Sequence, residues 1–229
     1  MYPDCRQFGN DLQRVHNELV RMQLLDGPTG IQLNPCGQCA RTRRGGSCDQ
    51  VCVEIYRDRP LRFVPDERFG LRPEIACKTI RTGRDLEELL EHTLLVRLWQ
   101  RHPETGIDAV VHRVHIDRAN PGQSGPRHHL QLGGRTIGAG ESWPLPAISN
   151  ELRWPVPVFD AVLACELIVY TFYPERWEEF RALPEVKSAV KRSEVTSFSG
   201  LAVDWDKYRD GGFPDKSMSF LDILCGAAG

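Results

Sequence analysis

The chain has no long apolar run and no strong excess of charge. Its longest apolar stretch, VFDAVLACELIVYTFY, is interrupted by Asp160 and Glu166, so it falls short of the roughly 18 apolar residues that a membrane span needs. The N-terminal sequence MYPDCRQFGNDLQRVHNEL lacks the basic and apolar regions of a signal peptide. A formal net charge of -2 argues against a protein that coats nucleic acid with its whole surface. We therefore expect a soluble cytoplasmic protein.

The sequence also lacks the complete motifs of the common enzyme classes. It contains no G-x-S-x-G, P-loop, H-E-x-x-H or dinucleotide-binding fingerprint. The glycine-rich LGGRTIGAG precedes a Trp- and Pro-rich connector, whereas a phosphate-binding loop leads into a helix. With 41% apolar and 26% charged residues, the composition is that of a globular protein. These absences favour a binding protein over an enzyme.

Hydrophobic periodicity predicts helices in three parts of the chain. Apolar residues recur at helical intervals over 8–25, where Asp26-Gly27-Pro28 would end the helix, and over 84–102. A third helix is expected at 157–172. Two more are expected from Pro174 and Pro184, because Pro followed by an acid is typical of a first helical turn. The tail SMSFLDILC could form a last short helix.

Strands are expected between these helices. The candidates are IQLN, QVCVEIYR, IDAVVHRVHIDR, PRHHLQLGG and the Pro-punctuated RPLRFVPDERFGLRPEIACKTI, where each Pro should confine a strand to an edge or a turn. Strands do not alternate regularly with helices, so we predict a single α+β domain over 1–229 with a short-stranded antiparallel sheet. It would have an N-terminal helix, a mid-chain helix, a zinc loop at 34–53 and a C-terminal helical part at 157–225.

Four cysteines lie close together in NPCGQCARTRRGGSCDQVC, as the pairs Cys36/Cys39 and Cys48/Cys52. Zinc takes four tetrahedral ligands, and a C-x2-C turn supplies two of them. In a reducing compartment, clustered cysteines indicate metal ligands before disulfides. We therefore expect a structural zinc ion. An iron–sulfur cluster, free thiols and disulfides are the alternatives.

Between the two cysteine pairs lie Arg41, Arg43 and Arg44. These arginines could bind phosphate or nucleic acid, because the guanidinium group grips phosphate with two hydrogen bonds. The alternative is a solvated loop whose positive charges offset the thiolates.

Part of the same stretch resembles an enzyme signature. PCGQC is similar to the PC-x-x-C zinc motif of cytidine and nucleobase deaminases, whose partner H-x-E could be His16-Asn17-Glu18. That partner lies in the first expected helix, and Cys48 and Cys52 would fill the coordination position that a deaminase keeps open. The structural zinc site is therefore the favoured interpretation.

The histidines and one carboxylate form a second group of candidates. Alternation along the strand places His128 with Leu130 and Leu132, and His129 with Gln131, so His129 is the better candidate for an open cleft. Glu166 lies in the apolar helix at 157–172 and needs a partner, which could be His112, His128 or an arginine.

The order of elements resembles the layout of the E2 ubiquitin-conjugating enzymes. An opening amphipathic helix, a strand-rich middle, a His-containing strand end, a Trp/Pro connector and terminal helices carry this resemblance. The sequence has no His-Pro-Asn, and no cysteine closely follows His128 and His129. The resemblance therefore implies a non-catalytic relative, in which the helix at 84–102 is an insertion.

Two functions follow from these residues, in addition to nucleic-acid binding through the Arg41–Arg44 loop. The first is a zinc-stapled, non-catalytic binding or assembly subunit that contacts other protein subunits. The second is a hydrolase or nucleotide-processing enzyme that uses His129 or His128 with Glu166 as acid and base.

Overall fold

The computed structural model describes residues 5–26, 31–35, 50–82, 88–118, 128–132, 154–155 and 159–207. Within these ranges the chain forms an α+β fold with an eight-stranded sheet in which every strand pair is antiparallel. The strands are β1 (Ile31–Pro35), β2 (Gln50–Ile55), β3 (Leu61–Arg62), β4 (Leu71–Thr82), β5 (Glu88–Arg101), β6 (Asp108–Arg118), β7 (His128–Leu132) and β8 (Trp154–Pro155). The helices are α1 (Cys5–Arg21), α3 (Ala161–Phe172), α4 (Pro174–Ala182) and α5 (Pro184–Lys207).

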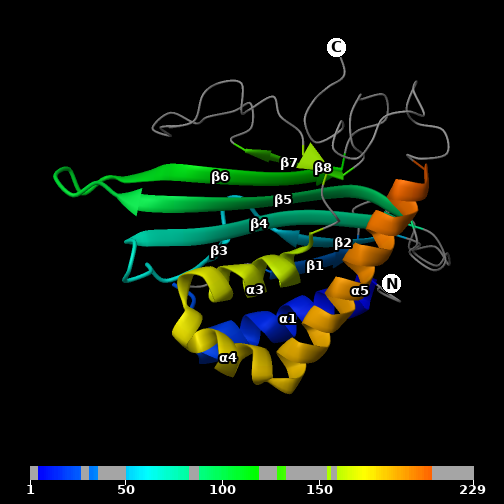
Figure 1. Ribbon diagram of the computed structural model, residues 1–229, viewed down its shortest axis with the longest axis horizontal. Coiled ribbons are helices and arrows are strands. Elements are labelled where there is room, and N and C mark those ends of the chain that lie inside the picture. The colour runs from blue at the N-terminus through cyan, green and yellow to red at the C-terminus, as the bar shows by residue number, and fades with distance from the viewer. Residues whose placement is uncertain are drawn as a thin grey trace, which may run out of the picture.

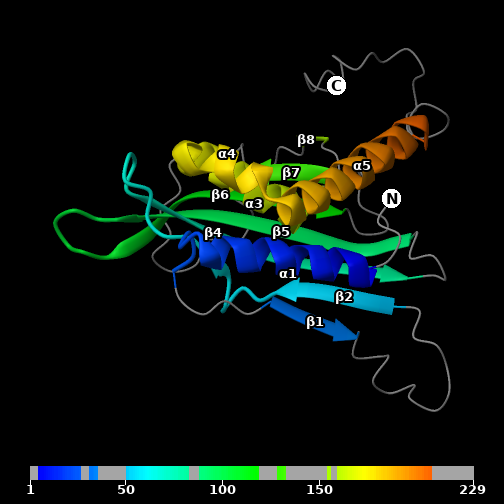
Figure 2. The same cartoon turned by 90° about the horizontal axis from the view of Figure 1, so that it is seen from below.

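The sheet is a meander that follows the order of the chain. Its strands run β1-β2-β4-β5-β6-β7-β8, with β3 paired to β4. Figure 1 shows the helices gathered on one side of the sheet. Helix α1 runs alongside β2 (Figure 2). Helix α3 contacts β4. In the described part of the chain, the other face carries no helix, and we call it the helix-free face.

Alternation along the strands assigns each side chain to one face. Val53, Ile75, Leu94 and Ile116 belong to the core that the helices cover. Their sequence neighbours point the other way, because side chains alternate in a strand. The helix-free face therefore carries Glu54, Glu74, Ala76, Leu95 and Asp117.

The predicted mid-chain helix at 84–102 is wrong, because residues 88–101 form β5. This strand pairs with β4 on one side and β6 on the other. Both Leu94 and Leu95 are buried, on opposite faces of the sheet. A strand with apolar residues on both faces can show the same apolar spacing as an amphipathic helix, which explains the wrong prediction. The sheet is also not short-stranded, since β4, β5 and β6 have 12, 14 and 11 residues.

Proline does not confine β4 to an edge, which corrects a second expectation. Pro73 lies inside β4 and faces Leu98 of β5. Its carbonyl accepts a hydrogen bond from the backbone N–H of Phe63, at 2.9 Å, on the β3 side. In a strand the N and the C=O of one residue point to the same side, so the missing N–H faces β3 and the ladder to β5 stays complete.

Local interactions explain where α1 ends and where α3 begins. Helix α1 ends at Arg21, before the predicted Asp26-Gly27-Pro28, because Gln23 takes a left-handed conformation with φ 59. The N–H groups of Gln23 and Leu24 then bond to the carbonyls of Val20 and Leu19, which is the Schellman pattern. Helix α3 begins at Ala161 because the Asp160 carboxylate caps it, and the predicted Pro174 and Pro184 starts are confirmed.

Candidate functional site

The β1–β2 hairpin leads into the cysteine stretch from both sides. Pro35 at the end of β1 pairs with Val51, and Asn34 pairs with Cys52. The predicted ligands Cys36, Cys39 and Cys48 lie outside the described residues, as does the side chain of Cys52. The arginines at 41, 43 and 44 lie outside them too. Among the residues that the structure describes, no group of three or more His, Cys, Asp or Glu side chains could hold a metal ion.

Glu166 belongs to the helix layer. Its carboxylate lies 3.1 Å from Arg181, whose guanidinium also lies 3.1 Å from Glu194. Burial raises the pKa of Glu166, the charge of Arg181 opposes this, and Glu194 raises it further. An arginine is thus the partner of Glu166, which was one of the three expected possibilities.

His129 lies on the opposite side of the sheet from the helices. It pairs with Asp117 of β6, whereas its neighbour Leu130 packs against the helix-covered core. His129 is only 3% exposed, so it does not line an open cleft. His129 and Glu166 therefore lie on different sides of the sheet, and the predicted acid–base pair is not brought together. His128 pairs with Arg118, and its side chain lies outside what is described.

The structure instead brings His129 to Asp117 and His115. The Nδ1 atom of His115 lies 3.0 Å from the Asp117 carboxylate, and Thr93 faces Asp117 across the β5–β6 pair. Burial alone would raise the pKa of Asp117. Hydrogen bonds from His115 and Thr93, together with the charges of His115 and His129, hold this pKa below its ordinary value. The Nε2 atom of His115 is buried and has no hydrogen-bond partner within the described segments.

Sequence reasoning missed Asp117, although the signal was present. Alternation along VVHRVHIDR places Asp117 on the same face as His115. The expected pairing of this strand with PRHHLQLGG adds a histidine-containing neighbour, and the register of the structure is what places His129 opposite Asp117. The residue that the sequence favoured, Glu166, stood out because it interrupts an apolar helix.

Comparison of the chain with family models, with curated proteins and with solved structures gives no match.

Proposed function

We propose that this protein is a zinc-stapled, non-catalytic subunit of a cytoplasmic multi-protein complex. Its zinc finger would be the stretch between β1 and β2, with Cys36, Cys39, Cys48 and Cys52 as ligands. The observation that carries the proposal is the register of the β1–β2 hairpin. Cys36 is bonded directly to Pro35, and Cys52 lies opposite Asn34, so strand pairing holds both ends of the stretch at neighbouring positions. Such an arrangement suits ligands that converge on one tetrahedral ion.

The helix-free face supports a role in binding other proteins. Trp99 lies between two arginines, with the guanidinium carbons of Arg72 and Arg97 at 5.8 and 5.5 Å from its ring centroid. Glu74, only 1% exposed, holds this group by accepting from Trp99 at 2.6 Å and pairing with Arg97 at 3.1 Å. Protein interfaces are enriched in Trp and Arg.

The order of the elements supports an E2-like form of this subunit. The described chain runs from α1 through an antiparallel meander to α3, α4 and α5. The segment 84–102, expected to be a helical insertion, contains β5 and so belongs to the meander.

Metal analysis tests the zinc site. Purified protein is expected to contain one zinc ion per chain, because four thiolates close one tetrahedral shell. The double variant Cys36→Ser/Cys39→Ser should lose the zinc and the ability to co-purify with partners from the native host. Cys5→Ser is the matched control, since it removes a cysteine outside the stretch, and it should retain both. Wild-type protein without zinc would refute the proposal.

The histidine cluster favours a second candidate, an acid–base enzyme in which Asp117 replaces Glu166. Asp117 would accept the Nδ1 proton of His115, which leaves the lone pair of Nε2 to take a proton from a substrate. His129 would adjoin the same carboxylate.

A panel of chromogenic esters and phosphate esters tests this candidate. A hydrolytic activity that Asp117→Asn abolishes, and that Glu166→Gln leaves intact, is the expected result. The absence of activity in the wild type, or activity insensitive to Asp117→Asn, would exclude it.

A further inference from the structure

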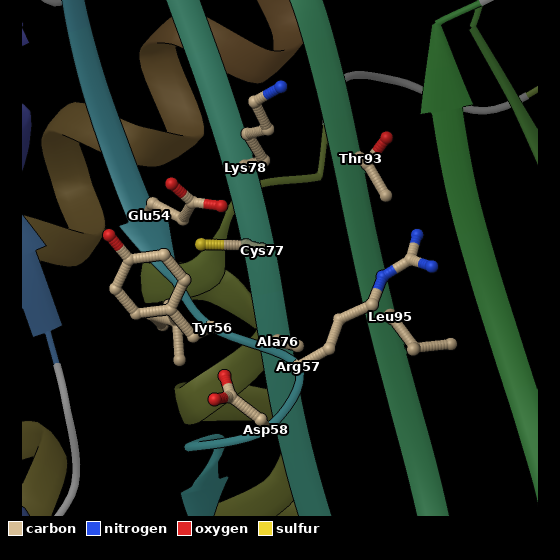
Figure 3. Close-up of a pocket in the computed structure, with 10 residues that line it drawn as sticks. Glu54, Tyr56, Arg57, Asp58, Ala76, Cys77, Lys78, Thr93 and Leu95 are labelled. Atoms are coloured by element: carbon tan, nitrogen blue, oxygen red, sulfur yellow. The ribbon is translucent and has the colours of Figure 1, made fainter. Parts of the chain in front are cut away.

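A hollow of about 450 Å³ lies between β2, β4 and β5 on the helix-free face. Its polar lining comes from Glu54, Tyr56, Arg57, Asp58, Lys78 and Thr93. Figure 3 shows these side chains in front of the sheet, with the helices behind it. The volume falls within the range of about 300–1,000 Å³ that is usual for small-molecule sites.

The rim of the hollow carries charges of both signs. Figure 3 shows Arg57 extending across β4 toward Leu95, while Glu54 and Asp58 lie on its other side. Within the described part of the chain, neither carboxylate has an ion-pair or hydrogen-bond partner, and neither does the Arg57 guanidinium. Unpaired charges of opposite sign in one hollow are complementary to a ligand that itself carries both signs.

The floor of the hollow is apolar. Ala76 and Leu95 line it and are 3% and 7% exposed, although they point away from the helix-covered core. An apolar floor beneath a charged rim suits a ligand with an aliphatic side chain, because burying that side chain is favourable.

We propose that this hollow binds a small zwitterion, a free α-amino acid with an aliphatic side chain. The ammonium group would contact Glu54, and the carboxylate would contact Arg57, which can grip it with two hydrogen bonds. Asp58 and Lys78 would reinforce the two charges, and the side chain would rest on Ala76 and Leu95. This site depends neither on zinc at the cysteines nor on proton transfer by His115.

Calorimetric titration with three related probes tests the proposal: L-leucine, N-acetyl-L-leucine, which lacks the ammonium, and L-leucinamide, which lacks the carboxylate. L-leucine is expected to bind most tightly. Glu54→Gln should weaken the binding of L-leucine about tenfold. It should leave the affinity for N-acetyl-L-leucine unchanged, because that probe has no ammonium group to contact Glu54. Arg57→Gln should weaken the binding of L-leucine about tenfold and leave the affinity for L-leucinamide unchanged.

Two exposed residues outside the hollow provide matched controls. Arg59→Gln and Glu67→Gln remove the same kinds of charge without touching the lining, and they should bind L-leucine as the wild type does. The proposal is overturned if none of the twenty amino acids binds at millimolar concentration. It is equally overturned if Glu54→Gln and Arg57→Gln bind L-leucine as tightly as the wild type.

Discussion

The connection between β5 and β6 is closed by its own backbone hydrogen bonds. The connection between β1 and β2 is more than twice as long and is rich in cysteine. Residues 102–107 are closed by a hydrogen bond from the His102 N–H to the Ile107 carbonyl and another from the Gly106 N–H to the His102 carbonyl, both 2.9 Å. Gly106 supplies the left-handed conformation that the turn requires, with φ 66. The backbone alone therefore explains this turn.

Residues 36–49 connect two strands that are also paired in register. Closing a longer connection costs more conformational entropy, and connections of this length in compact domains are usually functional. A metal that draws the cysteines together would offset this cost. With the proposed zinc site in place, the meander would close one hairpin by backbone geometry and the other by metal ligands.

Metal removal is expected to give the largest effect. A chelator should lower the free energy of unfolding by about 4 kcal/mol, the linkage expected when free zinc exceeds its dissociation constant a thousandfold. Differential scanning calorimetry measures this change. The double variant Cys36→Ser/Cys39→Ser should not respond to the chelator. If the wild-type protein melts identically with and without chelator, metal does not stabilise the β1–β2 hairpin, and the proposed difference between the two hairpins is wrong.

A core substitution should weaken the sheet without altering the metal response. Leu94 is fully buried beneath the helices, so Leu94→Ala should cost about 3 kcal/mol in chemical denaturation. Leu95→Ala is the matched change on the helix-free face. It should cost about half as much, because Leu95 lines the hollow on one side, whereas Leu94 is fully buried. Equal effects would show that the two faces are equally packed.

The short turn is tested by Gly106→Ala. The new Cβ would meet Arg101 no closer than 3.5 Å, so the positive φ sets the penalty. We expect a loss of about 1 kcal/mol with unchanged zinc content. A loss of zinc on this substitution would contradict the independence of the two hairpins.

The smallest change in stability is expected for Asp117→Asn, at acidic pH. The pKa of Asp117 lies below the ordinary value of 3.8, so the ionised carboxylate stabilises the fold above that pH. This contribution disappears as the pH falls through the folded-state pKa. Asp117→Asn should therefore flatten the dependence of stability on pH in this acidic window, as measured by urea denaturation. An unchanged slope would show that His115 and Thr93 do not stabilise the carboxylate.

Local signals predicted the helices of the C-terminal part, and long-range pairing explains where prediction failed. Pro174 and Pro184 mark the starts of α4 and α5, because proline at a first helical position acts within one turn. By contrast, the leucine- and glutamate-rich β5 has the composition of a helix. Two long neighbouring strands override that preference, and a single sequence does not reveal them.

The candidate sites likewise include features that the local sequence predicts and features that depend on how distant strands pair. The order of IQLN, the cysteine stretch and QVCVEIYR predicts two strands flanking a cysteine loop. Strand β1 extends IQLN by Pro35, and β2 lies within QVCVEIYR. The pairing of Asp117 with His129 depends on the register between β6 and β7, which no single strand pattern contains. The hollow likewise combines β2, β4 and β5, so it could not be found by reading one segment.

X-ray absorption at the zinc edge tests the proposed zinc centre most directly. A zinc ion with four sulfur neighbours at about 2.3 Å is the expected result. Nitrogen or oxygen ligands in place of sulfur, or a protein that contains no zinc, would contradict it.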